Sequence, residues 1–226
     1  MRLEQDPIHR HKDVLAHSIA VVGKVAPRRA DGAPNRITRL AALFHDVGKP
    51  KTRSFDQGAG VSFHHHEAVG ARMTRDRMQA LRYSNADVEA VTRLVFLHLR
   101  FHTYRLGWTD SAVRRFVRDA GDLLVELIEL TRSDCTTRNE KKATTLARRM
   151  DELEERIATL RLQEEIDAIR PDLDGRAVMD LLDVAPGPDV GRALAFLLEL
   201  RLEEGPLGHE ESARRLKAWW DAQRES

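Results

Sequence analysis

The sequence has 226 residues, 42% hydrophobic and 32% charged, which is enough for one or two folded domains with a hydrophobic core. Its 37 basic and 36 acidic residues nearly cancel, which excludes a chain-wide basic field for binding nucleic acid but leaves room for a local patch. A single cysteine, Cys135, excludes an intrachain disulfide framework, and we find neither a signal peptide nor a membrane-spanning apolar run, so we expect a cytoplasmic protein with no membrane contact.

Hydrophobic periodicity and helix-breaking residues predict an all-α chain in which no segment shows the alternation of a strand. Leu, Ala, Arg and Glu dominate and only 5% of the residues are aromatic, which suits a helical protein. In chain order, we expect helices over about residues 12–25, 35–47, 63–81, 84–102, 109–121, 122–134, 140–170, 175–182, 190–204 and 210–223. The expected organisation is a histidine-bearing bundle at 1–139, followed at 140–226 by a long helix with a coiled-coil-like seam and a C-terminal helical appendage.

Nine of the ten histidines lie in the first 102 residues, and the second expected helix ends in the pair His45-Asp46. Gly48 and Pro50 follow directly, a pattern that is typical of a helix C-terminus. Imidazole and carboxylate groups are the nitrogen and oxygen ligands that divalent transition metals prefer. The pair alone proves little, so the hypothesis of a metal site depends on partners elsewhere in the chain.

Two such partners occupy core-facing positions of other expected helices. His17 shares a face with Val14 in the first helix, and Asp134 takes the next core-facing position after Leu130 in the sixth. An unpaired buried carboxylate is costly, so Asp134 needs a partner, and a metal ion is one candidate.

Further histidines come from the middle helices. His98 and His102 continue the apolar stripe of the fourth helix at i, i+4 spacing, so both imidazoles are expected to face the core. His64, His65 and His66 open the third helix, and the first two are more typical of solvent-facing or substrate-lining residues. Any one of these histidines also fits a hydrogen-bonded structural role.

His17, His45-Asp46 and Asp134 match, in order, the H…HD…D ligand pattern of the HD-domain superfamily of metal-dependent phosphohydrolases, which the sequence therefore resembles. The resemblance implies an all-α HD-domain bundle with a metal site on these four residues. Some members hold a second ion with two more histidines, and His66 and His98 match those positions, with Asp46 bridging the two ions. Histidine-rich ligation favours Mn, Fe, Co, Ni or Zn over Mg, so we expect one or two transition-metal ions per chain.

The His-Asp-x-Gly-Lys form at 45–49 resembles the phosphodiesterase-like members of this superfamily, in which the lysine contacts a phosphate. Asp46 and Lys49 are therefore the expected catalytic residues, and Lys51, Arg53 and His102 are expected to contact substrate. A divalent metal lowers the pKa of a bound water and neutralises phosphate oxygens, while a lysine adds positive charge. Alternatively, Lys49 is a lysine at a helix C-terminus that the helix dipole favours.

Five segments resemble, more narrowly, the HD region of bacterial CCA-adding tRNA nucleotidyltransferases. They are residues 6–14, 45–50, 63–71, 133–139 and 186–191. These 226 residues contain no nucleotidyltransferase head with a Gly-Ser-type motif and paired aspartates, so the resemblance does not extend to nucleotide addition. The sequence is expected to be the C-terminal half of such an enzyme or a free-standing relative.

The function expected from these resemblances is hydrolysis of nucleotide or RNA 3′-end phosphoesters, as a 2′,3′-cyclic phosphodiesterase, 2′-nucleotidase or phosphatase, with tRNA as a candidate partner. The alternative is a non-catalytic RNA-binding body that has kept the ligands. A degenerate scaffold is expected to have lost a ligand, and none of the H…HD…H…H…D positions is missing. The Trp219-Trp220 pair favours packing over base stacking, since no basic cluster interleaves it.

Overall fold

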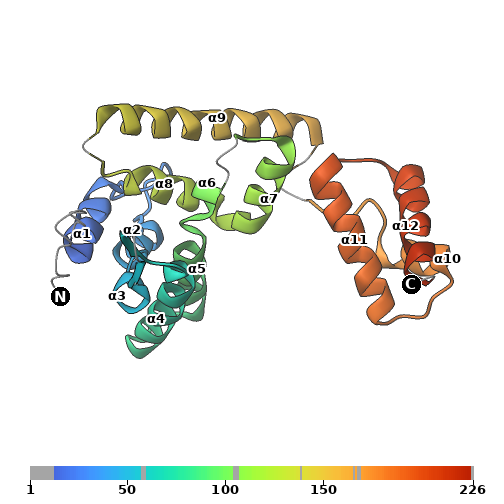
Figure 1. Ribbon diagram of the computed structural model, residues 1–226, viewed down its shortest axis with the longest axis horizontal. Coiled ribbons are helices and arrows are strands. Elements are labelled where there is room, and N and C mark those ends of the chain that lie inside the picture. Colours follow the sequence, from blue (N-terminus) through green and yellow to red (C-terminus); the bar gives the residue numbers. More distant parts are fainter. Residues whose placement is uncertain are drawn as a thin grey trace. The chain divides into compact units, whose positions relative to one another are not determined.

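The structure is a computed structural model that describes residues 13–56, 60–103, 107–137, 139–164, 166 and 169–224. The chain forms two compact units: unit 1 is Met1–Arg105 with Ala120–Asp151, and unit 2 is Leu106–Asp119 with Glu152–Ser226. The all-α prediction is confirmed, because helices make up nearly all regular structure among the described residues (Figure 1). The predicted division into domains at residue 139 stays a prediction.

Unit 1 is a helical bundle built around α2. Its helices are α1 (Val14–Lys24), α2 (Arg36–Phe44), α3 (Lys49–Thr52), α4 (His66–Ala80), α5 (Asn85–Leu97), α6 (Arg100–Thr103), α8 (Leu124–Asp134) and the N-terminal part of α9 (Glu140–Glu164), with a 3₁₀ turn at Gly121–Leu123. Helix α2 packs against α1, α5 and α8, and α4 packs against α5. The C-terminal end of α2, where the His-Asp pair follows, is therefore surrounded by the other helices of the unit.

Local sequence explains where the helices of unit 1 begin and which faces they bury. Asp13 and Ser84 cap α1 and α5, each accepting a backbone N–H with its side chain, and such caps contribute about 1 kcal/mol each. The predicted stripe of α5 is buried, since Val91 and Leu94 have no exposed surface. Burying such a side chain contributes roughly 1.5–3 kcal/mol.

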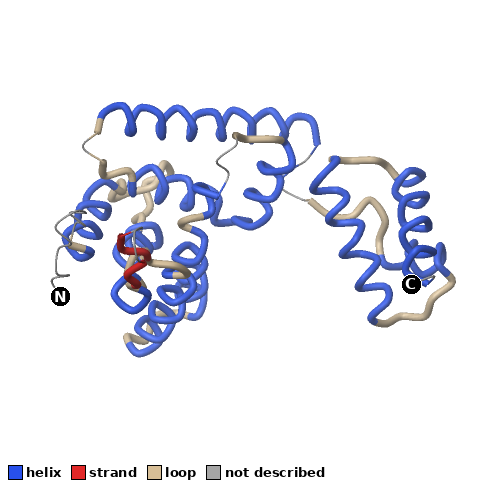
Figure 2. Tube along the Cα trace, viewed as in Figure 1, coloured by secondary structure: helices blue, strands red, loops and turns tan. Residues whose placement is uncertain are grey.

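The expectation that no strand occurs is wrong at one place. A short antiparallel hairpin, β1 (Ser54–Asp56) and β2 (Gly60–Ser62), follows α3, with Ser54 opposite Ser62 and Phe55 opposite Val61 (Figure 2). Strands of three residues are too short to show a period of two, so the sequence pattern does not reveal them.

Two predicted helices of unit 1 end earlier than expected. Helix α2 stops at Phe44 rather than near residue 47, and α5 stops at Leu97 before the predicted 84–102 span is complete. The chain continues through turns into the one-turn helices α3 and α6. Consequently, His45 and His98 are the C-cap residues of α2 and α5 and not residues within helices.

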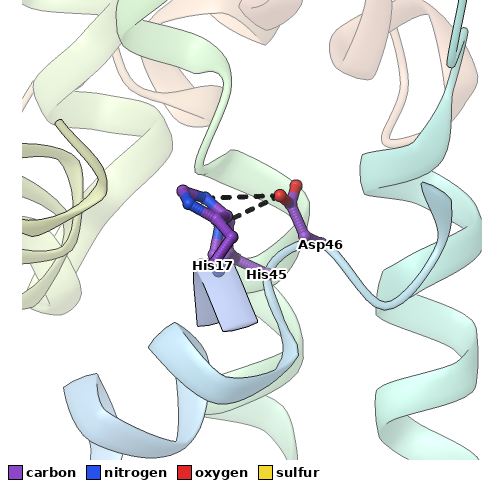
Figure 3. Close-up of side chains that lie close together, drawn as sticks. All are labelled: His17, His45 and Asp46. Atoms are coloured by element: carbon purple, nitrogen blue, oxygen red, sulfur yellow. Dashed lines mark hydrogen bonds and ion pairs between the residues drawn. The ribbon is translucent and has the colours of Figure 1, made fainter. Parts of the chain in front are cut away.

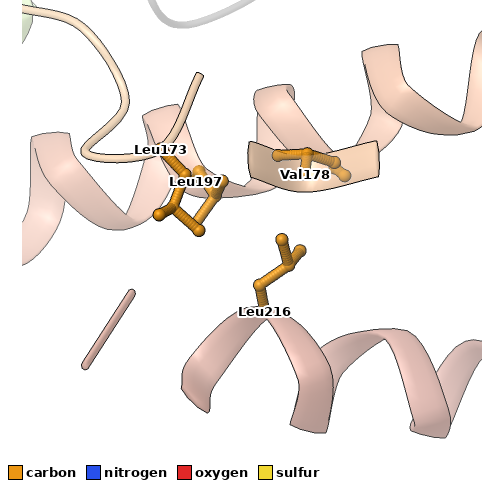
Figure 4. Close-up of a cluster of buried hydrophobic side chains, with 5 residues drawn as sticks. Leu173, Val178, Leu197 and Leu216 are labelled. Atoms are coloured by element: carbon orange, nitrogen blue, oxygen red, sulfur yellow. The ribbon is translucent and has the colours of Figure 1, made fainter. Parts of the chain in front are cut away.

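Unit 2 has a small apolar core between its last three helices. Its helices are α7 (Asp110–Ala120), the C-terminal part of α9 (Glu140–Glu164), α10 (Gly175–Leu182), α11 (Pro188–Glu204) and α12 (His209–Arg224). The core cluster consists of Leu173, Val178, Ala193, Leu197 and Leu216 (Figure 4). Trp219 packs against this cluster and stacks on Phe196 with ring centroids 4.7 Å apart, which fits the predicted packing role of that tryptophan.

The predicted seam of the long helix is buried, from Met150 and Leu153 through Ile157 to Leu160. Among the residues that the structure describes, no helix is both long enough and apolar enough to span a membrane.

Candidate metal centre

The His-Asp pair lies in a tight turn between α2 and α3. The Val47 N–H donates to the Phe44 carbonyl at 3.0 Å, and the Lys49 N–H donates to the Asp46 carbonyl at 3.0 Å. His45 and Asp46 are 0% and 2% exposed, so this turn carries a polar pair into the interior of unit 1. Buried polar groups of this kind need partners.

Four side chains form the first set of candidate ligands: His17 from α1, His45 and Asp46 from the turn, and Asp134 from the end of α8. Nε2 of His17 lies 3.2 Å from Nε2 of His45 and 2.9 Å from Oδ1 of Asp134. Oδ2 of Asp46 lies 3.5 Å from Nε2 of His17 and 3.4 Å from Nε2 of His45 (Figure 3). Oδ1 of Asp134 is 3.5 Å from Nε2 of His45. The two imidazoles thus meet two carboxylates at one point.

The other oxygen of Asp46 faces a second set. Oδ1 lies 3.4 Å from Nε2 of His66, at the start of α4, and 3.8 Å from Nε2 of His98, at the end of α5. The two imidazole nitrogens are 3.3 Å apart. Asp46 therefore belongs to both sets, with two imidazole nitrogens near each of its carboxylate oxygens.

Hydrogen bonds to the far side of each ring orient the imidazoles. Nδ1 of His45, His66 and His98 lies 2.8, 2.8 and 2.6 Å from the carbonyl oxygen three residues earlier. A carbonyl only accepts, so Nδ1 carries the proton and Nε2 presents its lone pair in the neutral ring. For His17, the partner of Nδ1 is the hydroxyl of Thr136 at 3.1 Å. Such outer contacts fix ring orientation and tautomer in metal sites.

Close backbone packing brings α4 against the His-Asp turn. A Cβ atom on Gly48 would lie 2.2 Å from the carbonyl oxygen of His66 and 2.7 Å from the backbone nitrogen of Gly70. Gly48 has φ −74° and ψ −23°, which any residue adopts, so the prediction of a glycine-type helix ending gave the wrong reason for this residue. A glycine is needed at this position because the backbone of α4 approaches too closely to leave room for a Cβ atom. His65, which precedes His66, has a left-handed φ of 59°.

The ionisable groups of the centre strongly shift one another's pKa values. Burial lowers the pKa of His45, but hydrogen bonds and charges of Asp134 and Asp46 outweigh it and raise that pKa to about 10. Burial raises the pKa of the Asp46 and Asp134 carboxyl groups, but hydrogen bonds and charges of the neighbouring imidazoles outweigh burial and hold each pKa well below its usual range. Burial and the charge of His45 lower the pKa of His98 to about 3, so His98 is a neutral imidazole at pH 7.

The donor set fits divalent transition-metal ions. An ion about 2.1 Å from each ligand atom sets those atoms about 3.0 Å apart in octahedral geometry and about 3.4 Å apart in tetrahedral geometry. The separations of the first set, 2.9–3.5 Å, and of the second, 3.3–3.8 Å, lie close to these values. In the second set, two lone-pair nitrogens face each other at 3.3 Å, an arrangement that calls for a cation between them.

The predicted substrate residues lie at different distances from this centre. Nζ of Lys49 is 2.7 Å from Oδ2 of Asp46, so Lys49 is part of it. Lys51 is exposed on α3, and the guanidinium of Arg53 lies over the ring of Phe55, 4.5 Å from its centroid. His102 is on α6 and is not among the side chains gathered around Asp46.

Some features of the site carried no sequence signal, and others lie outside the described residues. Thr136 contacts His17 and Gly70 contacts Gly48 only because distant segments meet in the fold. Residues 6–12 and Arg138, which belong to the segments that resemble CCA-adding enzymes, lie outside the described residues. His64 and His65 are exposed, as predicted from their place at the start of the third helix.

Comparison with known proteins finds a matching family and similar curated proteins. The family described as HD domain matches residues 14–160, a span that contains all six candidate ligands. An A-adding tRNA nucleotidyltransferase of Deinococcus radiodurans is 34% identical over 219 residues, which is 96% of this chain and 49% of that protein. A CC-adding tRNA nucleotidyltransferase of Thermus thermophilus is 40% identical over 191 residues, or 83% of this chain and 41% of that protein. The chain thus spans about half the length of these relatives or less.

Proposed function

The chain belongs to the HD-domain family, and from that premise we propose that it is a metal-dependent phosphohydrolase acting on nucleotide phosphoesters. The specific activity that we propose is hydrolysis of 2′,3′-cyclic phosphodiesters and related phosphomonoesters. His17, His45, Asp46 and Asp134 would hold one ion, and the second set would hold another. Manganese, iron, cobalt, nickel and zinc suit this nitrogen-rich donor set better than magnesium.

One observation carries the proposal: a single buried carboxylate, Asp46, faces two sets of imidazoles, with a lysine against it. Two metal ions held close together would supply an activated water and positive charge on both sides of a phosphorus atom. A cluster of buried imidazoles with a purely structural role can be satisfied by hydrogen bonds to backbone carbonyls and needs no such bridging carboxylate. The arrangement therefore favours catalysis over a purely structural role.

The chain's own residues have separate tasks in this proposal. Asp46 positions both sets of imidazoles, because each of its oxygens lies within 3.8 Å of Nε2 atoms from two different helices or turns. Lys49 is 27% exposed, so its ammonium group reaches both Asp46 and solvent. It would turn toward a phosphate oxygen and offset the charge that develops on the departing oxygen. Lys51 and Arg53 would contact another phosphate oxygen, and His102 would line the substrate.

The relatives named above act on tRNA by their names, and this supports an RNA 3′ end in the cytoplasm as a candidate substrate. The same names favour a second candidate function, in which this chain is a non-catalytic body that binds tRNA and keeps the ligands. The two functions differ in what metal does: hydrolysis requires it, whereas tRNA binding by a supporting body does not.

Metal analysis followed by a phosphoester panel tests the proposal. Protein prepared without chelator is expected to contain one to two transition-metal ions per chain by elemental analysis. With Mn, Co or Ni present, it is expected to hydrolyse 2′,3′-cyclic nucleotides or 2′-nucleotides, and a chelator is expected to stop the reaction. Asp46→Ala is expected to abolish turnover while helical circular dichroism persists.

Two results would count against hydrolysis. A metal-free protein that takes up none of these ions contradicts the site itself. A fully metallated protein that is inactive on cyclic nucleotides, nucleoside monophosphates and tRNA 3′ ends, yet binds tRNA equally well with chelator, supports the RNA-binding body instead.

A further inference from the structure

The hairpin that follows α3 presents an aromatic ring to solvent. Phe55 in β1 is 67% exposed, although the guanidinium of Arg53 lies over its ring at 4.5 Å from the centroid. Arg53 covers one face of the ring, so the large exposed fraction leaves the opposite face open. Among the residues that the structure describes, no carboxylate forms an ion pair with Arg53.

Contacts along the chain connect this hairpin to the candidate metal centre. Nζ of Lys49 lies 2.7 Å from Asp46 and 5.9 Å from the ring centroid of Phe63. Phe63 directly follows β2, whose last residue pairs with Ser54 at the open end of the hairpin. Phe55 is one residue further along, about 3.3 Å of strand. The hairpin of Phe55 follows directly from the short helix that begins at Lys49. The base of a nucleotide is one sugar away from its phosphate, so a nucleotide with its phosphate at Lys49 would extend its base away from the metal centre.

We propose that Arg53 and Phe55 form a base-stacking platform, so that the site takes phosphoesters carrying a nucleobase in preference to those without one. Every nucleobase has a flat π-face that stacks on an aromatic side chain, and a guanidinium on the other face strengthens the stack. This inference rests on the proposed function for the identity of the phosphoester. It adds the part of the substrate that the metal ligands do not recognise.

A binding experiment on the full chain, as prepared with its metal, tests the platform without requiring turnover. The probes are adenosine 2′-monophosphate and a ribose phosphate that lacks the base, titrated by calorimetry. Phe55→Ala is expected to weaken adenosine 2′-monophosphate binding about tenfold or more relative to ribose phosphate. Phe55→Trp is expected to restore the preference and to add tryptophan fluorescence that the nucleotide quenches.

Matched controls separate stacking from loss of any surface group. Phe96 on α5 is also exposed, at 52%, so Phe96→Ala removes the same side chain elsewhere on unit 1 and is expected to leave the preference unchanged. Arg53→Gln is expected to weaken the binding of adenosine 2′-monophosphate more than that of ribose phosphate, because loss of a phosphate contact alone would weaken both probes equally. Arg72→Gln, at an exposed arginine of α4, is expected not to do so.

The outcomes of this test and of the activity test are distinguishable. The platform is overturned if Phe55→Ala weakens the binding of both probes equally. It is also overturned if Phe55→Ala and Phe96→Ala change the base preference equally, even if the protein is an active hydrolase. An inactive protein whose base preference depends on Phe55 keeps the platform and contradicts the proposed hydrolysis. Quenching of Phe55→Trp by ribose phosphate as strongly as by the nucleotide also overturns the platform.

Discussion

Two of the four imidazoles that face Asp46 belong to C-cap residues. Their Nδ1–H groups donate hydrogen bonds to backbone carbonyls in the last turn of the preceding helix. His45 bonds the carbonyl of Ala42 in the last turn of α2, and His98 bonds that of Val95 in α5. The last carbonyls of a helix lack backbone partners, so these bonds satisfy them. At the same time, they aim Nε2 of each ring inward. The placement of these ligands just after a helix end thus orients them before any metal binds.

Replacing one histidine of each set is expected to affect the two metal ions differently. His17→Ala removes a ligand of the first set, where His45 and both carboxylates also lie, and is expected to abolish the first ion and turnover. His98→Ala is expected to spare the first ion and to lower the metal content toward one ion per chain, because only Asp46 and His66 remain in the second set. Elemental analysis of both variants checks this. Loss of all metal in both would instead indicate one site.

Lys49→Ala is expected to keep the metal and to slow turnover by roughly 10²-fold or more, the effect of removing a typical oxyanion donor. The reason is that Lys49 lies 2.7 Å from Asp46 but is no ligand itself. Lys51→Ala, two residues away at an exposed position, is the matched control for charge and is expected to have a smaller effect. Steady-state kinetics and the metal content of the two variants test this prediction. An equal loss of turnover in both would assign Lys49 only a general electrostatic role.

At the scale of elements, the contact between the His-Asp turn and α4 sets the separation of the two ligand sets. Gly48→Ala is expected to push α4 away, because a Cβ would lie 2.2 Å from the His66 carbonyl. We expect loss of the second ion and destabilisation by about 1–3 kcal/mol, the usual cost of overpacking. Gly23→Ala in α1, where a Cβ meets nothing within 4 Å, is the control. Metal content and urea unfolding test both, and unchanged metal in Gly48→Ala would contradict this role of the contact.

The C-terminal end of α9 carries a buried carboxylate that the helix dipole disfavours. Glu164 accepts two hydrogen bonds of 2.8 Å from Arg114 on α7 and one of 2.9 Å from Arg201 on α11. Burial raises the pKa of Glu164, but these two arginines outweigh burial and hold it below the usual 4.5. A lowered pKa means that the ion pair stabilises unit 2 fully above about pH 4.5 and is lost as the pH falls through the lowered value.

Glu164→Gln is therefore expected to destabilise the protein by about 3 kcal/mol at pH 7, because it removes the anion shared by two buried arginines, of which Arg201 keeps only Asp172, at 3.7 Å. The difference from the unsubstituted protein is expected to shrink below about pH 4.5, where protonation removes the same charge. Urea unfolding at pH 7 and at pH 3 measures it. Glu210→Gln on α12, at an exposed carboxylate, is the control and is expected to show no such pH dependence. A constant difference at both pH values would exclude the ion pair as its cause.

The sequence allowed prediction of those parts of the site that depend on local periodicity. His17 follows an apolar face, and Asp134 follows a buried stripe, so helical spacing alone brings both to the interior. The close contact of Gly48 with Gly70 and the bond from Thr136 to His17 join segments that are distant in sequence, so no local pattern predicts them. The hairpin of Phe55 is too short for a periodic signal, and hydrophobic periodicity does not fix the exact residues at which α2 and α5 end.

At the scale of the whole molecule, the candidate ligands and the natural fluorophores belong to different units. All six candidate ligands lie in unit 1, within Met1–Arg105 and Ala120–Asp151. The three tryptophans, Trp108, Trp219 and Trp220, lie in unit 2. Tryptophan fluorescence therefore reports on unit 2 alone, whereas helical circular dichroism reports on both. The two signals give separate readings of what metal does to each unit.

Removing metal with a chelator is expected to lower the unfolding temperature of unit 1. A ligand present at about 100 times its Kd stabilises the folded state by about 2.7 kcal/mol, which corresponds to roughly 5–10 °C for a unit of this size. Because no candidate ligand lies in unit 2, the fluorescence transition is expected to move less than the circular dichroism transition. Asp46→Ala, which removes the carboxylate shared by both sets, serves as the control and is expected to show no response to chelator. Equal shifts of the two transitions in the unsubstituted protein would mean that metal stabilises the two units together.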